Sequence, residues 1–186
     1  MNENPSGLEV KFVNRALAQR LPQYLGPWKA KKTDLGQSNP TFVLFGKNKS
    51  LVLRRKPHGN LLRSAHLVER EFAVMKALKS TLVPVPKVYY LCEDPAEIGS
   101  VYFVMEFIDG ITFPQPDLPN LDSSQRAKVY DEMNFGLAAL HSVIPREVGL
   151  EKFGKSKSYF ERQLMRWSKQ FDASSTERIF EMESLE

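Results

Sequence analysis

An arginine and a glutamate are the two residues in this sequence whose types and surroundings could do chemistry together. Arg54 follows the apolar run Leu51–Leu53, which is typical of a strand, and Glu71 lies beside Phe72 in a stretch with helical spacing of apolar residues. A strand followed directly by a helix can bring the two charges together. A guanidinium held by a carboxylate presents a permanent, forked positive charge that suits phosphate. The alternative is that Arg54 simply lies on a strand face.

A small polar segment, Gly36–Thr41, precedes the strand that carries the arginine. Its sequence is Gly-Gln-Ser-Asn-Pro-Thr. A loop with a glycine and short polar side chains can bring backbone N–H groups close to an anion. Ser38, Asn39 and Thr41 are therefore candidate phosphate contacts. Ordinary turn chemistry explains the same three residues equally well, and the sequence leaves both interpretations open.

The elements that must position these residues can be predicted from apolar spacing and turn signals. The first half of the chain predicts an α+β arrangement of five strands with a helix packed on them, mostly antiparallel because the connections are short. Glu69 and Arg70 are expected to point outward from that helix. The expected elements are helix 7–21, strand 28–35, a hairpin of 41–45 and 51–54, helix 61–75 with Ser64 as a possible cap, and strands 87–91 and 101–107.

The second half of the chain predicts helices with few partners. A proline-rich linker, 114–119, leads to a helix with Asp122 or Ser123 as its N-terminal cap. A later helix carries Phe160, Leu164 and Trp167 at helical spacing. The apolar faces of these helices either fold on each other or stay open to a partner, and the segment from Ser174 predicts only a marginal helix.

A series of short motifs carries a resemblance to a known family. They run in order as Gly36–Thr41, Leu51–Pro57, Ser64–His66 with Glu69–Phe72, Val83–Pro86, Leu91–Asp94, Phe103–Gly110 and Leu140–Val143, continued by Gly149–Gly154 and Arg162–Trp167. Together they resemble the aminoglycoside phosphotransferase-like (APH, kinase-like) family, in particular the kinase-like domain at the N-terminus of acyl-CoA dehydrogenase family members 10 and 11. The resemblance covers nearly the whole chain.

The resemblance implies a fold and a ligand. Residues 1–110 would form the small, nucleotide-binding lobe of a kinase-like fold, and 111–186 a linker and the start of a helical large lobe. ATP would be bound by Ser38, Asn39, Thr41, Arg54 and Glu71 and, at the hinge, by Glu106 and Ile108, where a buried strand-to-loop transition is the alternative. The full enzyme would use Mg²⁺ and phosphorylate a small hydroxylated substrate, with a hydroxy-acyl compound linked to acyl-CoA oxidation as one example. No FAD is expected in this portion.

One departure from the family concerns catalysis. Its His-Gly-Asp…Asn catalytic loop and later metal-binding Asp are not found up to Glu186, and His58-Gly59-Asn60 has asparagine where the base would be. We therefore expect no catalytic residue, no metal ligand and no phosphotransferase turnover in this chain by itself. Whether it belongs to an enzyme or forms a non-catalytic nucleotide- or partner-binding module stays open.

Composition narrows the other classes. The net charge is a mild +4, and the basic residues are scattered, so we expect no nucleic-acid partner. The single cysteine, Cys92, excludes an internal disulfide and is expected to be a buried, structural residue. No run approaches the roughly 18 apolar residues of a membrane helix. We expect an intracellular, soluble protein, cytoplasmic by default, and the resemblance leaves the mitochondrion or peroxisome open.

Overall fold

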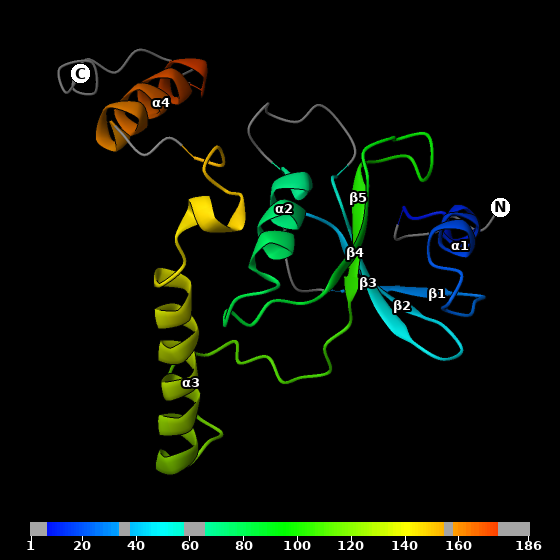
Figure 1. Ribbon diagram of the computed structural model, residues 1–186, viewed down its shortest axis with the longest axis horizontal. Coiled ribbons are helices and arrows are strands. Elements are labelled where there is room, and N and C mark those ends of the chain that lie inside the picture. Colours follow the sequence, from blue (N-terminus) through cyan, green and yellow to red (C-terminus); the bar gives the residue numbers. More distant parts are fainter. Residues whose placement is uncertain (1–6, 34–37, 58–65, 155–157, 175–186) are drawn as a thin grey trace. The chain divides into compact units, whose positions relative to one another are not determined.

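The computed structural model describes residues 7–33, 38–57, 66–154 and 158–174 of the 186-residue chain. Two compact units divide the chain, residues 1–144 and 145–186. The sheet and the first three helices belong to the first unit (Figure 1). These units are defined by how densely their residues contact one another, and they do not test the predicted lobe boundary at residue 110. That boundary stays a prediction. No helix in the described ranges has the length and apolar character needed to cross a membrane.

The centre of the first unit is a five-stranded sheet in which every neighbouring pair is antiparallel. This confirms the predicted α+β fold with its short connections. The observed strands start or end within one or two residues of the predicted ones, except that the first is shorter. In spatial order they are β1 (Lys29–Lys32), β2 (Thr41–Phe45), β3 (Ser50–Arg55), β5 (Tyr102–Glu106) and β4 (Val88–Cys92).

Helices cover both faces of this sheet. α1 (Val10–Arg20) and α2 (Val68–Leu78) lie on opposite sides of the strands in Figure 1. On the α2 side, the Phe72 ring meets the Phe103 ring edge to face at 6.0 Å between centroids. The sequence predicted both helices but placed only the second on the sheet. The packing of α1 is therefore an addition from the structure.

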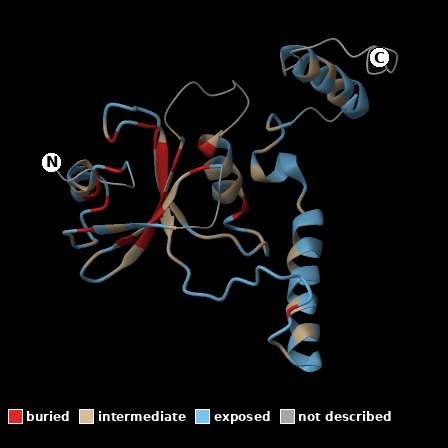
Figure 2. Cartoon of the chain, turned by 180° about the vertical axis from the view of Figure 1, so that it is seen from behind, coloured by how far each residue is buried: buried red, intermediate tan, exposed pale blue. Residues whose placement is uncertain are grey.

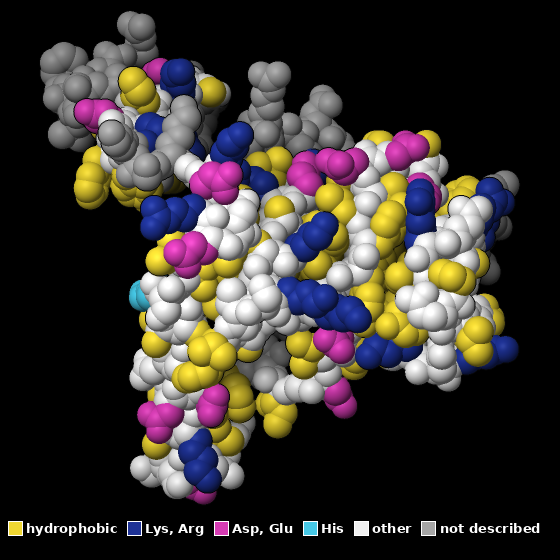
Figure 3. Space-filling model, viewed as in Figure 1, with side chains coloured by type: hydrophobic (Ala, Val, Ile, Leu, Met, Phe, Trp, Pro, Cys, Tyr) yellow, Lys and Arg dark blue, Asp and Glu magenta, His cyan; other side chains and the backbone are white. Residues whose placement is uncertain are grey.

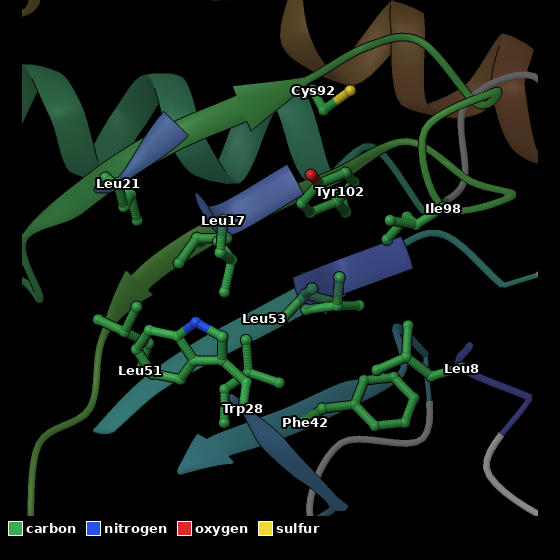
Figure 4. Close-up of a cluster of buried hydrophobic side chains, with 13 residues drawn as sticks. Leu8, Leu17, Leu21, Trp28, Phe42, Leu51, Leu53, Cys92, Ile98 and Tyr102 are labelled. Atoms are coloured by element: carbon green, nitrogen blue, oxygen red, sulfur yellow. The ribbon is translucent and has the colours of Figure 1, made fainter. Parts of the chain in front are cut away.

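The main apolar core lies between α1 and the sheet. Alternate residues of each strand point toward it, as the two-residue period of a strand requires. Phe42 and Leu53, which face each other across β2 and β3, are both fully buried there. Cys92 also lies in this core, as predicted. Figure 4 shows the cluster, whose members are Leu8, Val13, Leu17, Leu21, Trp28, Phe42, Leu44, Leu51, Leu53, Cys92, Ile98, Tyr102 and Val104.

The opposite strand positions face α2, and they include the arginine singled out above. Thr41 pairs with Arg54 across β2 and β3, and Arg54 pairs with Phe103 across β3 and β5. These three residues therefore share one face of the sheet. Because Arg55 is the next residue, its side chain lies on the α1 face, where it is buried over the Phe42 ring. Arg54 and Arg55 therefore point to opposite faces of the sheet.

Helix α2 begins later than predicted. It starts at Val68, after Leu67, whose side chain makes no capping hydrogen bond. The preceding residue, His66, has a left-handed backbone with φ of 59°. The proposed cap Ser64 and the earlier part of the predicted helix lie outside the described residues. The structure therefore places the turn into α2 at His66.

Helix α3 (Ser123–His141) has the predicted start but an exposed apolar face. The Asp122 side chain accepts from the Gln125 backbone N–H, and the Gln125 side chain accepts from the Asp122 N–H, which is a capping box. None of the residues of α3 is buried (Figure 2). Hydrophobic side chains interrupt the polar surface along α3 in Figure 3. The exposed ones are Tyr130, Met133, Phe135, Leu137 and Leu140.

The second unit contains a short 3₁₀ helix, η1 (Pro145–Val148), and helix α4 (Tyr159–Ser174). The predicted apolar residues of α4 are exposed, with Phe160, Leu164 and Trp167 each more than half accessible to solvent. The marginal helix predicted for the C-terminal segment begins at Ser174, the last residue of α4, and the rest of that segment lies outside the described residues.

Candidate functional site: an arginine fixed between a loop and a helix

The predicted pair forms a direct, two-pronged ion pair. Nε of Arg54 donates to Oε2 of Glu71 at 2.5 Å, and Nη2 donates to Oε1 of the same carboxylate at 3.3 Å. Both side chains keep a fraction of their surface in contact with solvent, 24% for Arg54 and 35% for Glu71. A bidentate pair holds the guanidinium plane in one orientation. The strand and helix therefore fix the direction in which the remaining donors of Arg54 point.

Thr41 supports the same guanidinium from the neighbouring strand. Nη1 of Arg54 donates to Oγ1 of Thr41 at 3.0 Å, and that hydroxyl donates to the backbone oxygen of Asn39 at 3.1 Å. Arg54 is thereby tied both to α2 and to the end of the polar loop. Thr41 was predicted as a phosphate contact, and the structure places it against the arginine.

Asn39 is the most deeply buried member of the group. Its side chain is 2% exposed, and its Nδ2 donates to Oε1 of Glu71 at 2.7 Å. Its carbonyl Oδ1 lies 3.1 Å from Nδ1 of His66. The side-chain partners of Asn39 in the structure are thus Glu71 and His66. The direct phosphate contact predicted for Asn39 stays a prediction. Ser38, by contrast, is exposed to solvent.

The structure adds two residues that the sequence argument overlooked. His66 was named only as part of the motif Ser64–His66 and was given no role, yet it lies against Asn39. Glu69 was expected to point outward, and that expectation is wrong. Its carboxylate, 30% exposed, accepts from Nζ of Lys56 at 2.5 Å. The two-residue spacing from Arg54 to Lys56 was a signal for this pair, because in an extended chain it points both cations to the same side.

The hinge residues lie at the end of β5, away from the arginine. The backbone N–H of Glu106 donates to the Lys87 oxygen at 2.8 Å, and its carboxylate is 3.6 Å from Nζ of Lys49. Ile108 follows the strand and is 62% exposed. The predicted adenine contact of Glu106 would have to use a group other than its N–H. The roles of both residues stay predictions.

The donor set of the site fits a phosphate-bearing ligand. Of the five N–H donors of an arginine, three contact Glu71 and Thr41 within the described part of the chain. The guanidinium is also partly open to solvent. These residues fit a nucleotide phosphate better than Mg²⁺, because the site carboxylate is already paired with the arginine. Among the described residues, no group of three or more His, Cys, Asp or Glu side chains is suited to hold a metal ion.

A second polar cluster lies on the α1 side of the sheet, around Glu97. Its Oε2 accepts from the hydroxyls of Tyr102 at 2.6 Å and Tyr90 at 2.9 Å, and Nε of Arg20 is 3.7 Å from Oε1. Burial opposes ionisation of Glu97. Hydrogen bonds from Cys92 and the two tyrosines, with the charge of Arg20, outweigh burial and lower its pKa. The pKa of Tyr102 is raised, first by burial and then by Glu97.

Comparisons with known proteins identify the family of this chain. Residues 29–186 match the model of a family described as "Phosphotransferase enzyme family". The chain is 46% identical over 160 residues to mouse acyl-CoA dehydrogenase family member 10, and 50% over 147 residues to a probable acyl-CoA dehydrogenase, IBR3, of Arabidopsis thaliana. It is 37% identical over 183 residues to human acyl-CoA dehydrogenase family member 11. These alignments cover 86%, 76% and 94% of the chain, respectively.

A solved structure shows the same fold. The crystal structure of a candidate aminoglycoside phosphotransferase from Ralstonia eutropha superposes with a TM-score of 0.75 at 39% identity, over 96% of this chain. The chain spans 51% of that protein and 15%, 18% and 24% of the mouse, Arabidopsis and human relatives. The family match extends from β1 through α4 and includes Arg54 and Glu71. The chain belongs to the phosphotransferase enzyme family, the APH kinase-like family.

Proposed function

We propose that this chain is the nucleotide-gripping portion of an ATP-dependent, kinase-like phosphotransferase. The single observation that carries the proposal is the bidentate pair of Arg54 and Glu71, supported by Thr41. Phosphoryl transfer depends on positioning the nucleotide and neutralising its phosphates. The Arg54 guanidinium, held in one orientation beside the polar loop, can both position one phosphate group and neutralise its charge.

The roles of the site residues follow from their contacts. The two N–H donors of Arg54 that do not contact Glu71 or Thr41 are assigned to phosphate oxygens. Ser38, exposed at the loop, and the backbone beside it are assigned to the same phosphates, while Glu71 orients the arginine. Glu106 and Ile108 are assigned to the adenine end. Bound Mg²⁺ would neutralise phosphate charge, and no ligand for it is assigned in this chain.

The substrate assigned to the longer polypeptide is a small hydroxylated compound, with a hydroxy-acyl compound as the first one to test. Support comes from the names of the relatives, which place a homologous segment in acyl-CoA dehydrogenases of mouse, human and Arabidopsis. A hydroxyl is the group that a kinase-like site phosphorylates, and an acyl chain is the group that a dehydrogenase of this name handles. Transfer from ATP to a hydroxy-acyl thioester by the full-length protein is the corresponding assay.

Nucleotide binding by the chain itself is the direct test. Calorimetric titration with ATP, with and without Mg²⁺, should give saturable binding, and thermal stability should rise with nucleotide concentration because a ligand that binds only the folded state stabilises it. Inorganic pyrophosphate should compete. If ATP neither releases heat nor shifts the melting temperature at millimolar concentration, the proposal is wrong.

A second candidate function is that of a non-catalytic module that binds a protein partner. The observation in its favour is a shallow groove of about 430 Å³ between Val83–Pro84 and α3, lined largely by exposed apolar side chains. Apolar surface of this kind is typical of an interaction site. The test takes a second copy of the chain as the partner. This function would be favoured if the unsubstituted chain binds no ATP and self-associates, and if the Met133→Glu, Leu137→Glu double variant is monomeric.

A further inference from the structure

His66 occupies an unusual position at the edge of the arginine site. It lies two residues before α2 and has a left-handed backbone with φ of 59°, a conformation that is uncommon for residues other than glycine but is adopted more often by histidine, asparagine and aspartate than by most others. Its ring is partly buried, with Nδ1 3.1 Å from Oδ1 of Asn39. The turn at His66 therefore brings a ring nitrogen against a buried polar group.

The hydrogen-bond partners of Asn39 fix the direction of each bond in this group. The Glu71 carboxylate, paired with Arg54, is an acceptor, so the atom of Asn39 that faces it must be the amide nitrogen. The carbonyl oxygen of Asn39 therefore faces His66. A carbonyl oxygen only accepts, so Nδ1 of His66 must carry a proton.

We propose that His66 is a positioning residue for the nucleotide site, acting through Asn39. The imidazole Nδ1–H holds the Asn39 amide in the orientation that donates to Oε1 of Glu71, and Glu71 in turn orients the Arg54 guanidinium. The chain of contacts is His66 to Asn39, Asn39 to Glu71, and Glu71 to Arg54. It ties the residue before α2, the polar loop and β3 into one unit. The expected effect on ATP binding rests on the proposed nucleotide-binding function, whereas the chain of contacts does not.

The contact between His66 and Asn39 is important because the Asn39 side chain is buried. Asn39 is 2% exposed, so water has little access to its carbonyl oxygen. A buried acceptor that loses its donor is left unsatisfied unless the amide shifts toward another donor, and such a shift moves the nitrogen that donates to Glu71. The position of the carboxylate, and with it the angle of Arg54, would then change. His66 is therefore assigned to hold the amide in place rather than to touch the nucleotide.

Three substitutions separate the donor from the backbone requirement. His66→Asn keeps a nitrogen donor on Cγ, where the ring carries Nδ1, and asparagine tolerates the left-handed backbone. His66→Asp introduces a side chain of the same size as asparagine, with the same tolerance of the left-handed backbone, but it presents an acceptor to Oδ1 of Asn39. His66→Gly accommodates the backbone and removes the donor. Circular dichroism and the melting temperature without nucleotide establish that each variant folds.

The first measurement needs no nucleotide. Long-range ¹H–¹⁵N correlation spectra of the neutral imidazoles should show His66 as the tautomer protonated on Nδ1, assigned by the loss of its signals in His66→Asn. The Arg54 Nε–H resonance, assigned with Arg54→Lys, should keep its position in His66→Asn and move in His66→Asp and His66→Gly. A neutral His66 ring protonated on Nε2 alone, or an Arg54 resonance unchanged in all three variants, would overturn the inference.

The second measurement is the dissociation constant for ATP. Loss of the donor should weaken binding roughly tenfold in His66→Asp and His66→Gly, with His66→Asn within about threefold of the unsubstituted chain. Equal affinity in all four proteins would overturn the positioning role while leaving the proposed function intact. If the unsubstituted chain binds no ATP, the proposed function fails, and the tautomer and the Arg54 resonance alone decide the inference.

Discussion

Lys56, the residue after the last one of β3, and Glu69 of α2 form a second ion pair, with Nζ of Lys56 2.5 Å from Oε1 of Glu69. Lys56 is two residues after Arg54 in the chain, and Glu69 is two residues before Glu71. Two pairs between the same two segments oppose both sliding and rotation of α2. The orientation of Arg54 therefore depends on the position of the whole helix, which the second pair helps to fix.

Removing one partner of the second pair should destabilise the first unit. In the described part of the chain, Oε2 of Glu69 is buried without a hydrogen-bond partner, so the carboxylate depends on Lys56. Lys56→Met should lower the free energy of unfolding by about 1–2 kcal/mol, since a largely buried charge is left alone. Lys56→Met with Glu69→Leu should restore part of the loss. Urea denaturation of the single and double variants measures this coupling, and strict additivity would argue against it.

Substitution of the site arginine should weaken the binding of ATP. Arg54→Lys retains a charge but lacks the fork that contacts both Glu71 and Thr41, so ATP affinity should fall roughly tenfold. Arg54→Met should weaken ATP binding further. Titration calorimetry measures both effects. Arg70→Lys, at an exposed position of α2, is the matched control and should bind ATP like the unsubstituted chain.

The cluster around Glu97 predicts a specific dependence of stability on pH. The pKa of Glu97 is lowered in the folded chain, so the folded state favours its charged form. That contribution is present above the ordinary glutamate pKa of about 4.3 and is lost as the pH falls through the lower folded value. Glu97→Gln should be less stable than the unsubstituted chain at pH 7, with a gap that narrows below about pH 4.

Thermal melts between pH 3 and pH 7 test this dependence. A gap between the two proteins that stays constant over the whole range would contradict it. Tyr102→Phe removes one donor to the same carboxylate without removing the charge. It should therefore reproduce part of the Glu97→Gln effect, with the same direction of pH dependence.

Gly46 should be intolerant of any side chain because of its surroundings. A Cβ at this position would lie 2.7 Å from Cζ3 of Trp28 and 2.8 Å from the backbone oxygen of Leu25. Trp28 is buried in the core between α1 and the sheet, so it has little freedom to move. Gly46→Ala should destabilise by about 1–3 kcal/mol. Tryptophan fluorescence during denaturation measures this loss.

Gly110→Ala is the matched control for that substitution. No heavy atom lies within 4 Å of the place where its Cβ would stand, among the atoms considered around that glycine. The control variant should unfold at nearly the same denaturant concentration as the unsubstituted chain. An equal loss in both variants would mean that contact with Trp28 does not set the cost.

Local sequence signals determined a large part of the fold and the central pair of the site. The run Thr41–Phe45 of β-branched and aromatic residues predicted β2 at its observed bounds, and Asp122 was predicted as a cap of α3. Arg54 and Glu71 were predicted as partners because a strand and the following helix have fixed side-chain periods. These signals depend on residues near one another in the chain, and one sequence is sufficient to show them.

Tertiary structure decided the rest, because contacts between distant segments leave no local period. Asn39 and His66 are 27 residues apart, and only the packing of α2 on the sheet brings the ring to the amide. The same packing made Glu69 a partner of Lys56 rather than a solvated charge. The amide orientation of Asn39 follows from the acceptor beside it, which no pattern in the sequence could reveal.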